Sequence, residues 1–249
     1  LLTGFAQAQP FNNEWIDYNK TYYKFSVGSD GLYRISQSVL SGIGLGSTPA
    51  EQFQLWRNGE QVPLFTSVAT GAMGASDYIE FWGRMNDGRP DKVLYRNQDH
   101  QLNDRWSLET DTAVFFLTVN PTGNNLRLVN TANTLPTSAT PEPFFYHSAS
   151  LNHKQRINPG YAAIVGSAVY SSSYDQGEGW TSNDIGYNVT RTDNLTGLFP
   201  YTGTGANTPI LNLSATGNAL NPRTFSISVN STQLDLATMD YFDYVRRIV

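Results

Sequence analysis

Short alternations of apolar and polar residues over positions 21–88 predict a series of antiparallel strands. Tyr23, Phe25 and Val27 alternate with polar residues, a glycine-rich turn follows at 28–31, and positions 32–35 resume the alternation. A period of two places successive side chains on opposite faces of a strand, as in a sheet with one buried face. The pattern therefore predicts β structure from the start of the chain.

The clearest local signal is an asparagine–glycine pair between two apolar runs. Asn58 and Gly59 separate the runs 53–57 and 60–65. A type I′ turn requires positive φ at both central residues, which Asn and Gly tolerate best, so this pair predicts a β-hairpin. The run 78–82 is a further strand, closed by Asn-Asp-Gly at 86–88.

One helix is expected in the first half of the chain, within residues 36–46. Ser36 or Ser38 is a suitable N-cap for a short turn through Val39 and Leu40. Glycines at 42, 44 and 46 then end the helix.

Later apolar runs complete the set of expected strands. The run 114–119 is apolar on both faces, which is typical of a central buried strand. A strand or short helix is expected at 161–170, and further strands are expected at 210–213, 224–229, 233–236 and 244–249.

These elements predict an all-β chain of two sandwich-like, jelly-roll type antiparallel domains. Residues 11–130 form the first expected domain, and the Thr-, Ser- and Pro-rich stretch 131–143 is the expected linker. Residues 144–249 form the second domain, which we expect to continue past Val249 because the chain stops within a strand pattern.

The first ten residues are expected to be the remnant of a signal peptide. Residues 1–8 resemble the tail of an apolar signal segment, with Ala6 and Ala8 in an A-x-A cleavage site. The alternative is an ordinary apolar N-terminal strand. The signal interpretation places the protein outside the cell or on its surface, reached through the periplasm.

Composition narrows the classes of partner. Charged residues make up 15% of the 249, the formal net charge is −5, and no basic cluster exceeds the pair Arg246-Arg247. A nucleic-acid partner is therefore not expected. No apolar run approaches the roughly 20 residues of a membrane-spanning helix. The chain has no cysteine, which excludes disulfides, thiolate metal sites and a cysteine nucleophile.

No motif predicts catalysis by this chain. The G-x-S-x-G, H-E-x-x-H and phosphate-loop patterns are all missing from the sequence. The spacing of His100, His147 and His153 suits no zinc pair. We therefore expect no enzyme activity, no catalytic residues and no resident cofactor.

Acidic loop residues are the candidates for a metal ion. Asp175, Glu178 and Asp184 form one group that could bind calcium through carboxylate oxygens, and Asp87 with Asp91 forms another. Neither matches a calcium-loop pattern. The favoured interpretation is that these side chains accept hydrogen bonds from local backbone N–H groups.

Tryptophans are the candidates for contacts with a ligand or partner. An exposed aromatic ring can stack on a sugar. The main candidates are Trp56 and Trp180, and the further candidates are Trp82 and Trp106. Packing in the core or between neighbouring strands is the favoured alternative for side chains in this pattern.

Five stretches resemble the N-terminal, non-catalytic region of gingipain-like cysteine peptidases of the Bacteroidetes. They are WIDYNKTYYKF at 15–25, DGLYRI at 30–35, FQLWRNGEQVP at 53–63, DYIEFWG at 77–83 and YDQGEGW at 174–180. The resemblance implies a long protein exported by the type IX secretion machinery, in which β-rich leading domains precede a catalytic domain with a His/Cys dyad. No catalytic residue carries over, because the chain has no cysteine.

The resemblance makes the downstream catalytic domain of the same polypeptide the expected partner. The chain would then be a pro- or accessory region that binds and shields that domain. A cleft-blocking role requires an exposed basic side chain on a loop, such as Arg89, Arg96 or Lys154. The alternatives are a carbohydrate-binding or adhesive surface module and a structural subunit of a cell-surface assembly.

Overall fold

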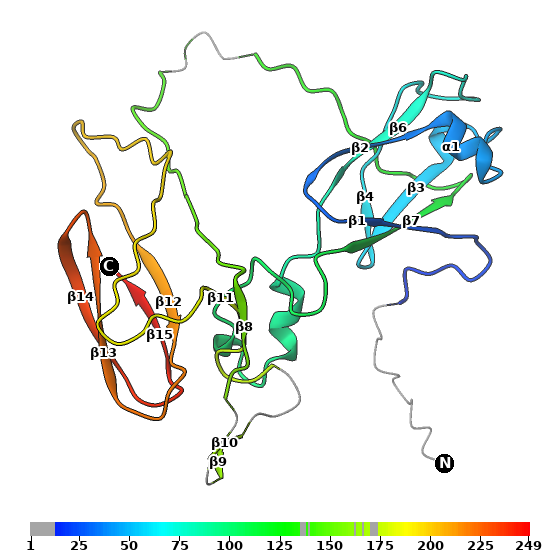
Figure 1. Ribbon diagram of the computed structural model, residues 1–249. Coiled ribbons are helices and arrows are strands. Elements are labelled where there is room, and N and C mark those ends of the chain that lie inside the picture. The colour runs from blue at the N-terminus through cyan, green and yellow to red at the C-terminus, as the bar shows by residue number, and fades with distance from the viewer. Residues whose placement is uncertain (1–12, 135–137, 139, 162, 166, 170–173) are drawn as a thin grey trace, which may run out of the picture. The chain divides into compact units, whose positions relative to one another are not determined.

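The computed structural model describes residues 13–134, 138, 140–161, 163–165, 167–169 and 174–249, and it forms two compact units (Figure 1). Unit 1 comprises Leu1–Met85 and Asp111–Leu135, and unit 2 comprises Asn86–Thr110 and Pro136–Val249. The expected signal remnant lies outside the described residues, as do positions 135–137 and 139 of the expected linker.

Unit 1 is built from two antiparallel sheets. The four-stranded sheet has the order β1 (Tyr23–Val27), β7 (Ala113–Val119), β3 (Phe53–Arg57), β4 (Glu60–Val62), and the three-stranded sheet has the order β2 (Gly31–Ser36), β6 (Tyr78–Gly83), β5 (Phe65–Thr66). β7 pairs with both β1 and β3, which confirms the expected central position of this apolar strand. All ladders between the strands assigned in the described residues are antiparallel, and this confirms the all-β class.

Two local predictions for unit 1, the hairpin at 58–59 and the capped helix after Ser36, are confirmed. Asn58 and Gly59 have φ values of 50° and 80° and connect β3 to β4, as a type I′ hairpin requires. The helix α1 (Gln37–Gly42) is capped by the Ser36 hydroxyl, which accepts a hydrogen bond from the Val39 N–H. A single turn of 3-10 helix, η1 (Ala50–Gln52), precedes β3.

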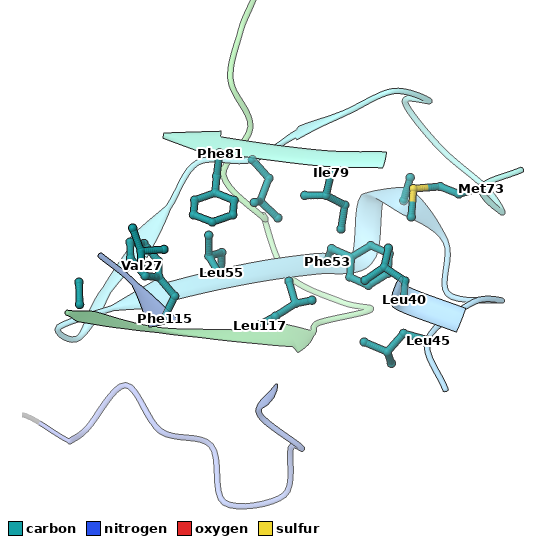
Figure 2. Packing of buried hydrophobic residues seen from close by; sticks show 13 residues of the cluster. Val27, Leu40, Leu45, Phe53, Leu55, Met73, Ile79, Phe81, Phe115 and Leu117 are labelled. Carbon is teal, nitrogen blue, oxygen red and sulfur yellow. The ribbon is translucent and has the colours of Figure 1, made fainter. Parts of the chain in front are cut away.

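The hydrophobic core of unit 1 lies between the two sheets (Figure 2). Ile79 and Phe81 of β6 point toward Leu55, Phe115 and Leu117 of the four-stranded sheet. The Phe81 ring centroid lies 5.3 Å from that of Phe115. Because side chains alternate along a strand, this contact fixes which residues of each strand face outward.

The turn at 28–31 joins the two sheets instead of making a hairpin. β1 pairs with β7 and β2 pairs with β6, so consecutive strands lie in opposite sheets. This connection leaves β2 as an edge strand of the three-stranded sheet.

Unit 2 contains two-stranded antiparallel sheets and short 3-10 helices among the residues described. The 3-10 helices are η2 (Arg89–Leu94) and η3 (Gln98–His100). The paired strands are β8 (Arg156–Asn158) with β11 (Gly179–Thr181), β9 (Ala163–Val165) with β10 (Ser167–Val169), β12 (Asn212–Thr216) with β15 (Tyr244–Ile248), and β13 (Arg223–Val229) with β14 (Thr232–Met239).

The segment Asn86–Thr110 belongs to unit 2, although we expected it within a first domain spanning 11–130. Its side chains explain the difference, because Asn103 donates to the Trp180 carbonyl at 2.9 Å and Tyr95 donates to the Glu178 carbonyl at 2.8 Å. The chain returns to unit 1 at Asp111, and all residues after Leu135 belong to unit 2. This second boundary falls within the expected linker 131–143.

Candidate binding surfaces

Trp56 is covered by the segment that precedes β1. Its ring stacks on Trp15 with centroids 5.3 Å apart, and Trp15 also packs against Phe116, the residue paired with Trp56 across β3 and β7. The Trp56 indole N–H is buried and has no hydrogen-bond partner among the described residues. This tryptophan therefore holds the N-terminal segment on the outer face of the four-stranded sheet, as the packing alternative expected, instead of offering a free ring.

The outer face of the three-stranded sheet carries a different tryptophan. We call Leu32, Arg34, Tyr78, Glu80 and Trp82 the exposed sheet face, since they alternate with the half-buried residues of β2 and the buried residues of β6. Leu32 lies opposite Trp82 across the two strands, and Arg34 lies opposite Glu80. Trp82 is 53% exposed and Leu32 is 61% exposed.

The charged pair of this face is held in a fixed arrangement. Arg34 Nε and Nη2 lie 2.9 and 2.7 Å from Glu80 Oε1, and the guanidinium carbon lies 3.6 Å from the Tyr78 ring centroid. The hydrogen bond to Glu80 raises the pKa of Arg34 above its ordinary value. The centre of the exposed sheet face is therefore an ion pair of Arg34 and Glu80.

The acidic calcium candidates of unit 2 are occupied by the protein's own groups. Glu178 Oε2 accepts the Asp175 N–H at 2.8 Å, and Asp184 is bound by Arg156. Asp91 accepts from the Ser107 hydroxyl and the Leu108 N–H, each at 2.9 Å, while Asp87 accepts from Arg89 Nε at 2.7 Å. In the part of the chain that the structure describes, no group of three or more His, Cys, Asp or Glu side chains is placed to hold a metal ion.

Trp180 connects β11 to the segment 86–110. Its indole N–H donates to the Ser107 carbonyl at 3.0 Å, and its own carbonyl accepts from Asn103. The Lys154 ammonium lies 4.6 Å from the Trp106 ring centroid and 5.1 Å from that of Trp180. Trp106 and Trp180 thus both form cation–π contacts with Lys154 within unit 2.

The pKa of Glu178 makes the stability of the folded protein depend on pH. Desolvation raises the pKa of this carboxyl, and the negative charges of Asp175 and Glu109 raise it further. The hydrogen bond from the Asp175 N–H lowers the pKa, but by less than these effects raise it. Desolvation, together with the negative charges of Asp91, Glu109 and Glu178, raises the pKa of Tyr174 to about 12. The folded protein therefore holds a proton on Glu178 at a pH where the unfolded chain has released it.

We expect Glu178→Gln to flatten the pH dependence of unit 2 stability. In the native chain stability falls as pH rises through the ordinary and then the raised pKa, because the folded state binds more protons over that interval. Glutamine keeps an acceptor for the Asp175 N–H and carries no charge. Thermal unfolding of both proteins at several values from about pH 4 to pH 7 measures this; identical slopes would contradict it.

The three histidines have different surroundings. His153 is bound by Arg191 and Asp193, with 3.2 Å from its Nε2 to Asp193 Oδ2. The His100 ring packs edge-on against Tyr244, and His147 is exposed. The chain has no cysteine, so it is not itself a cysteine peptidase.

An exposed loop of unit 2 is anchored at both ends by buried side chains. We call residues 92–96, which comprise the end of η2 and the two residues after it, the anchored loop: Asp91 before it and Tyr95 within it are buried, while Val93 is 73% and Leu94 is 54% exposed. Asp91 is held by Ser107 and Leu108, and Tyr95 packs edge-on against Tyr174 with centroids 5.3 Å apart. The loop therefore displays apolar and basic side chains from a fixed base.

The three basic loop candidates differ in what surrounds them. Arg89 is paired with Asp87, and Lys154 lies over two indole rings. Arg96 is exposed at the end of the anchored loop and is part of no ion pair among the described residues. Of these three candidates, Arg96 is thus the one whose exposed side chain is in no ion pair among the described residues.

No protein-family model, curated protein or solved structure shows a significant match to the chain. Among the described residues, no helix has both the length and the apolar character that crossing a membrane requires.

Proposed function

We propose that the chain is the non-catalytic pro- or accessory region of a secreted gingipain-like cysteine peptidase, which binds and shields the catalytic domain downstream. The observation that supports it most directly is the anchored loop. A pro-region that covers an active cleft needs exposed side chains held in one conformation, since ordering a flexible loop on binding costs free energy.

The composition of the loop suits a peptidase cleft. Lys92, Val93, Leu94 and Arg96 are exposed, and the two buried side chains Asp91 and Tyr95 are each hydrogen-bonded to other segments of unit 2. Arg96 would enter a pocket that accepts basic side chains, and Leu94 and Val93 would add apolar contact. Export by the type IX machinery to the cell surface or exterior is part of the same proposal.

The test is inhibition of the separately expressed catalytic domain by this chain at a one-to-one ratio. We expect cleavage of a fluorogenic peptide to fall in the mixture. Undiminished activity, with no complex in size-exclusion chromatography, would overturn the proposal.

Substitution of Arg96 tests whether this residue makes the main contact with the catalytic domain. We expect Arg96→Ala to weaken inhibition at least tenfold, because a basic side chain that fills a specificity pocket dominates such contacts. Arg89→Ala is the matched control, since Arg89 lies in the same segment but is paired with Asp87. Equal inhibition by the Arg96→Ala variant and the native chain would mean that other residues make the inhibitory contact.

A further inference from the structure

The exposed sheet face of unit 1 combines an uncovered indole ring with a fixed pair of planar charged groups. Trp82 provides the ring, and Arg34 with Glu80 provides the pair. We propose that this face binds a neutral glycan, with one sugar ring stacked on Trp82 and its hydroxyl groups hydrogen-bonded to Arg34 and Glu80. This inference does not depend on the pro-region function.

The position of Trp82 in the sheet keeps the ring open and its base rigid. Its neighbours along β6, Phe81 and Gly83, are both buried, so the backbone that carries the indole is fixed by the core. Leu32 flanks it on the β2 side. On the other side β5 pairs only as far as Glu80, through Phe65, and does not reach the level of Trp82.

The charged pair offers both halves of a hydrogen bond to a hydroxyl. Arg34 directs Nε and Nη2 at Glu80 Oε1, which leaves further N–H donors of the guanidinium on the solvent side. Glu80 Oε2 has no hydrogen bond or ion pair of its own in the described structure, and the Glu80 side chain is 15% exposed beside an Arg34 side chain that is 56% exposed. A sugar hydroxyl both donates and accepts, and therefore suits this adjacent donor and acceptor.

The spacing and the charge balance favour the same ligand. Residues i and i+2 of a strand lie about 7 Å apart on one face, so Glu80 stands beside a ring stacked on Trp82. The two ions cancel, which removes any preference for an anionic sugar or a phosphate. Interaction between an apolar ring face and an aromatic side chain, together with a few directed polar groups, is the usual composition of a small-ligand site.

A protein partner fits this face less well. A stable protein interface buries about 800 Å² on each partner around an apolar centre, whereas one aromatic side chain contributes about 150–250 Å². The exposed apolar side chains here are Leu32 and Trp82 at one end and Phe65 at the level of Glu80, so the ion pair takes the centre. The formal charge of −5 disfavours a nucleic acid.

The experiment is binding of the full chain to an array of neutral oligosaccharides built from glucose, galactose, mannose and N-acetylglucosamine, followed by calorimetry on the best hit. We expect Trp82→Ala to weaken binding at least tenfold and Glu80→Gln to weaken it several-fold. Tyr187→Ala is the control, because Tyr187 is an aromatic residue of unit 2 that is 94% exposed. Since Trp82 points away from the core, its variant should keep the native melting temperature.

Two outcomes would overturn the glycan proposal. One is that the native chain binds no member of the array, and the other is that the Trp82→Ala variant binds as tightly as the native chain. In the second case, loss of self-association or of binding to the catalytic domain in this variant would make the face a protein interface. Inhibition of the peptidase is measured separately, so its failure and that of the glycan proposal are distinguishable.

Discussion

Replacing Phe81 by alanine is expected to destabilise unit 1 by about 3–5 kcal/mol, the range measured for removing a buried phenylalanine. The ring is fully buried between the two sheets and packs on Phe25, Tyr33 and Phe115 at centroid distances of 5.6, 5.7 and 5.3 Å. Three aromatic partners on different strands cannot collapse together into the space that it leaves. A loss of this size approaches the whole stability of an ordinary domain.

Hydrogen exchange measured peptide by peptide locates this effect in the intact chain. We expect faster exchange over 53–57 and 113–119, the strands of the opposite sheet, and unchanged exchange over 223–229 in unit 2. Trp82→Ala is the matched control: it removes the next side chain of the same strand from the exposed face and should change stability by less than about 0.5 kcal/mol. Equal losses for the two variants would mean that the inward and outward faces are assigned wrongly.

Local features of unit 1 could be predicted from the sequence because they depend on neighbouring residues. Asn58 and Gly59 adopt the positive φ values that the hairpin requires, and Ser36 caps α1. The apolar run of β7 indicated a strand with neighbours on both sides. Each of these depends on backbone or side-chain chemistry within a few residues.

Partner choice between strands could not be predicted in the same way. β1 and β2 follow one another in the chain and belong to opposite sheets, and β7 enters between β1 and β3 from a distant part of the sequence. The segment 86–110 joins unit 2 through contacts such as that of Tyr95 with Glu178. Alternation gives the face of each residue but contains no information on which strand lies beside it.

The same distinction applies to the candidate tryptophans. Trp56 was a reasonable candidate for an open ring, and only the structure shows Trp15 stacked on it. Trp82 could have been ranked above it from alternation alone, because it shares the face of Glu80, a residue that avoids the core, while Ile79 and Phe81 take the other face. Arg96 had no such signal in the sequence. Only the structure shows that Arg89 pairs with Asp87 and that Lys154 lies over two indole rings, whereas Arg96 is exposed.

The second large effect is expected at Gly160, where alanine should destabilise unit 2 by about 3 kcal/mol, combining overpacking with an unfavourable backbone conformation. Gly160 is buried with φ at +74°, and a Cβ atom there would lie 2.8 Å from the Cβ atoms of both Asp175 and Glu178. Those neighbours cannot retreat easily, because Glu178 is tied to the Asp175 N–H and its carbonyl accepts from Tyr95. The YDQGEGW loop would have to shift, and the bonds that hold Asn86–Thr110 would loosen with it.

Gly205 supplies the control that separates the steric contribution from the backbone contribution. It has φ at +81° in the same unit, and a Cβ atom there would meet nothing within 4 Å. Gly205→Ala should therefore cost only the backbone penalty, about 1 kcal/mol. Hydrogen exchange should rise over 86–110 and 174–181 for Gly160→Ala alone. If both variants lose the same stability, the close packing of Gly160 against Asp175 and Glu178 contributes nothing, and the loop is held by its hydrogen bonds only.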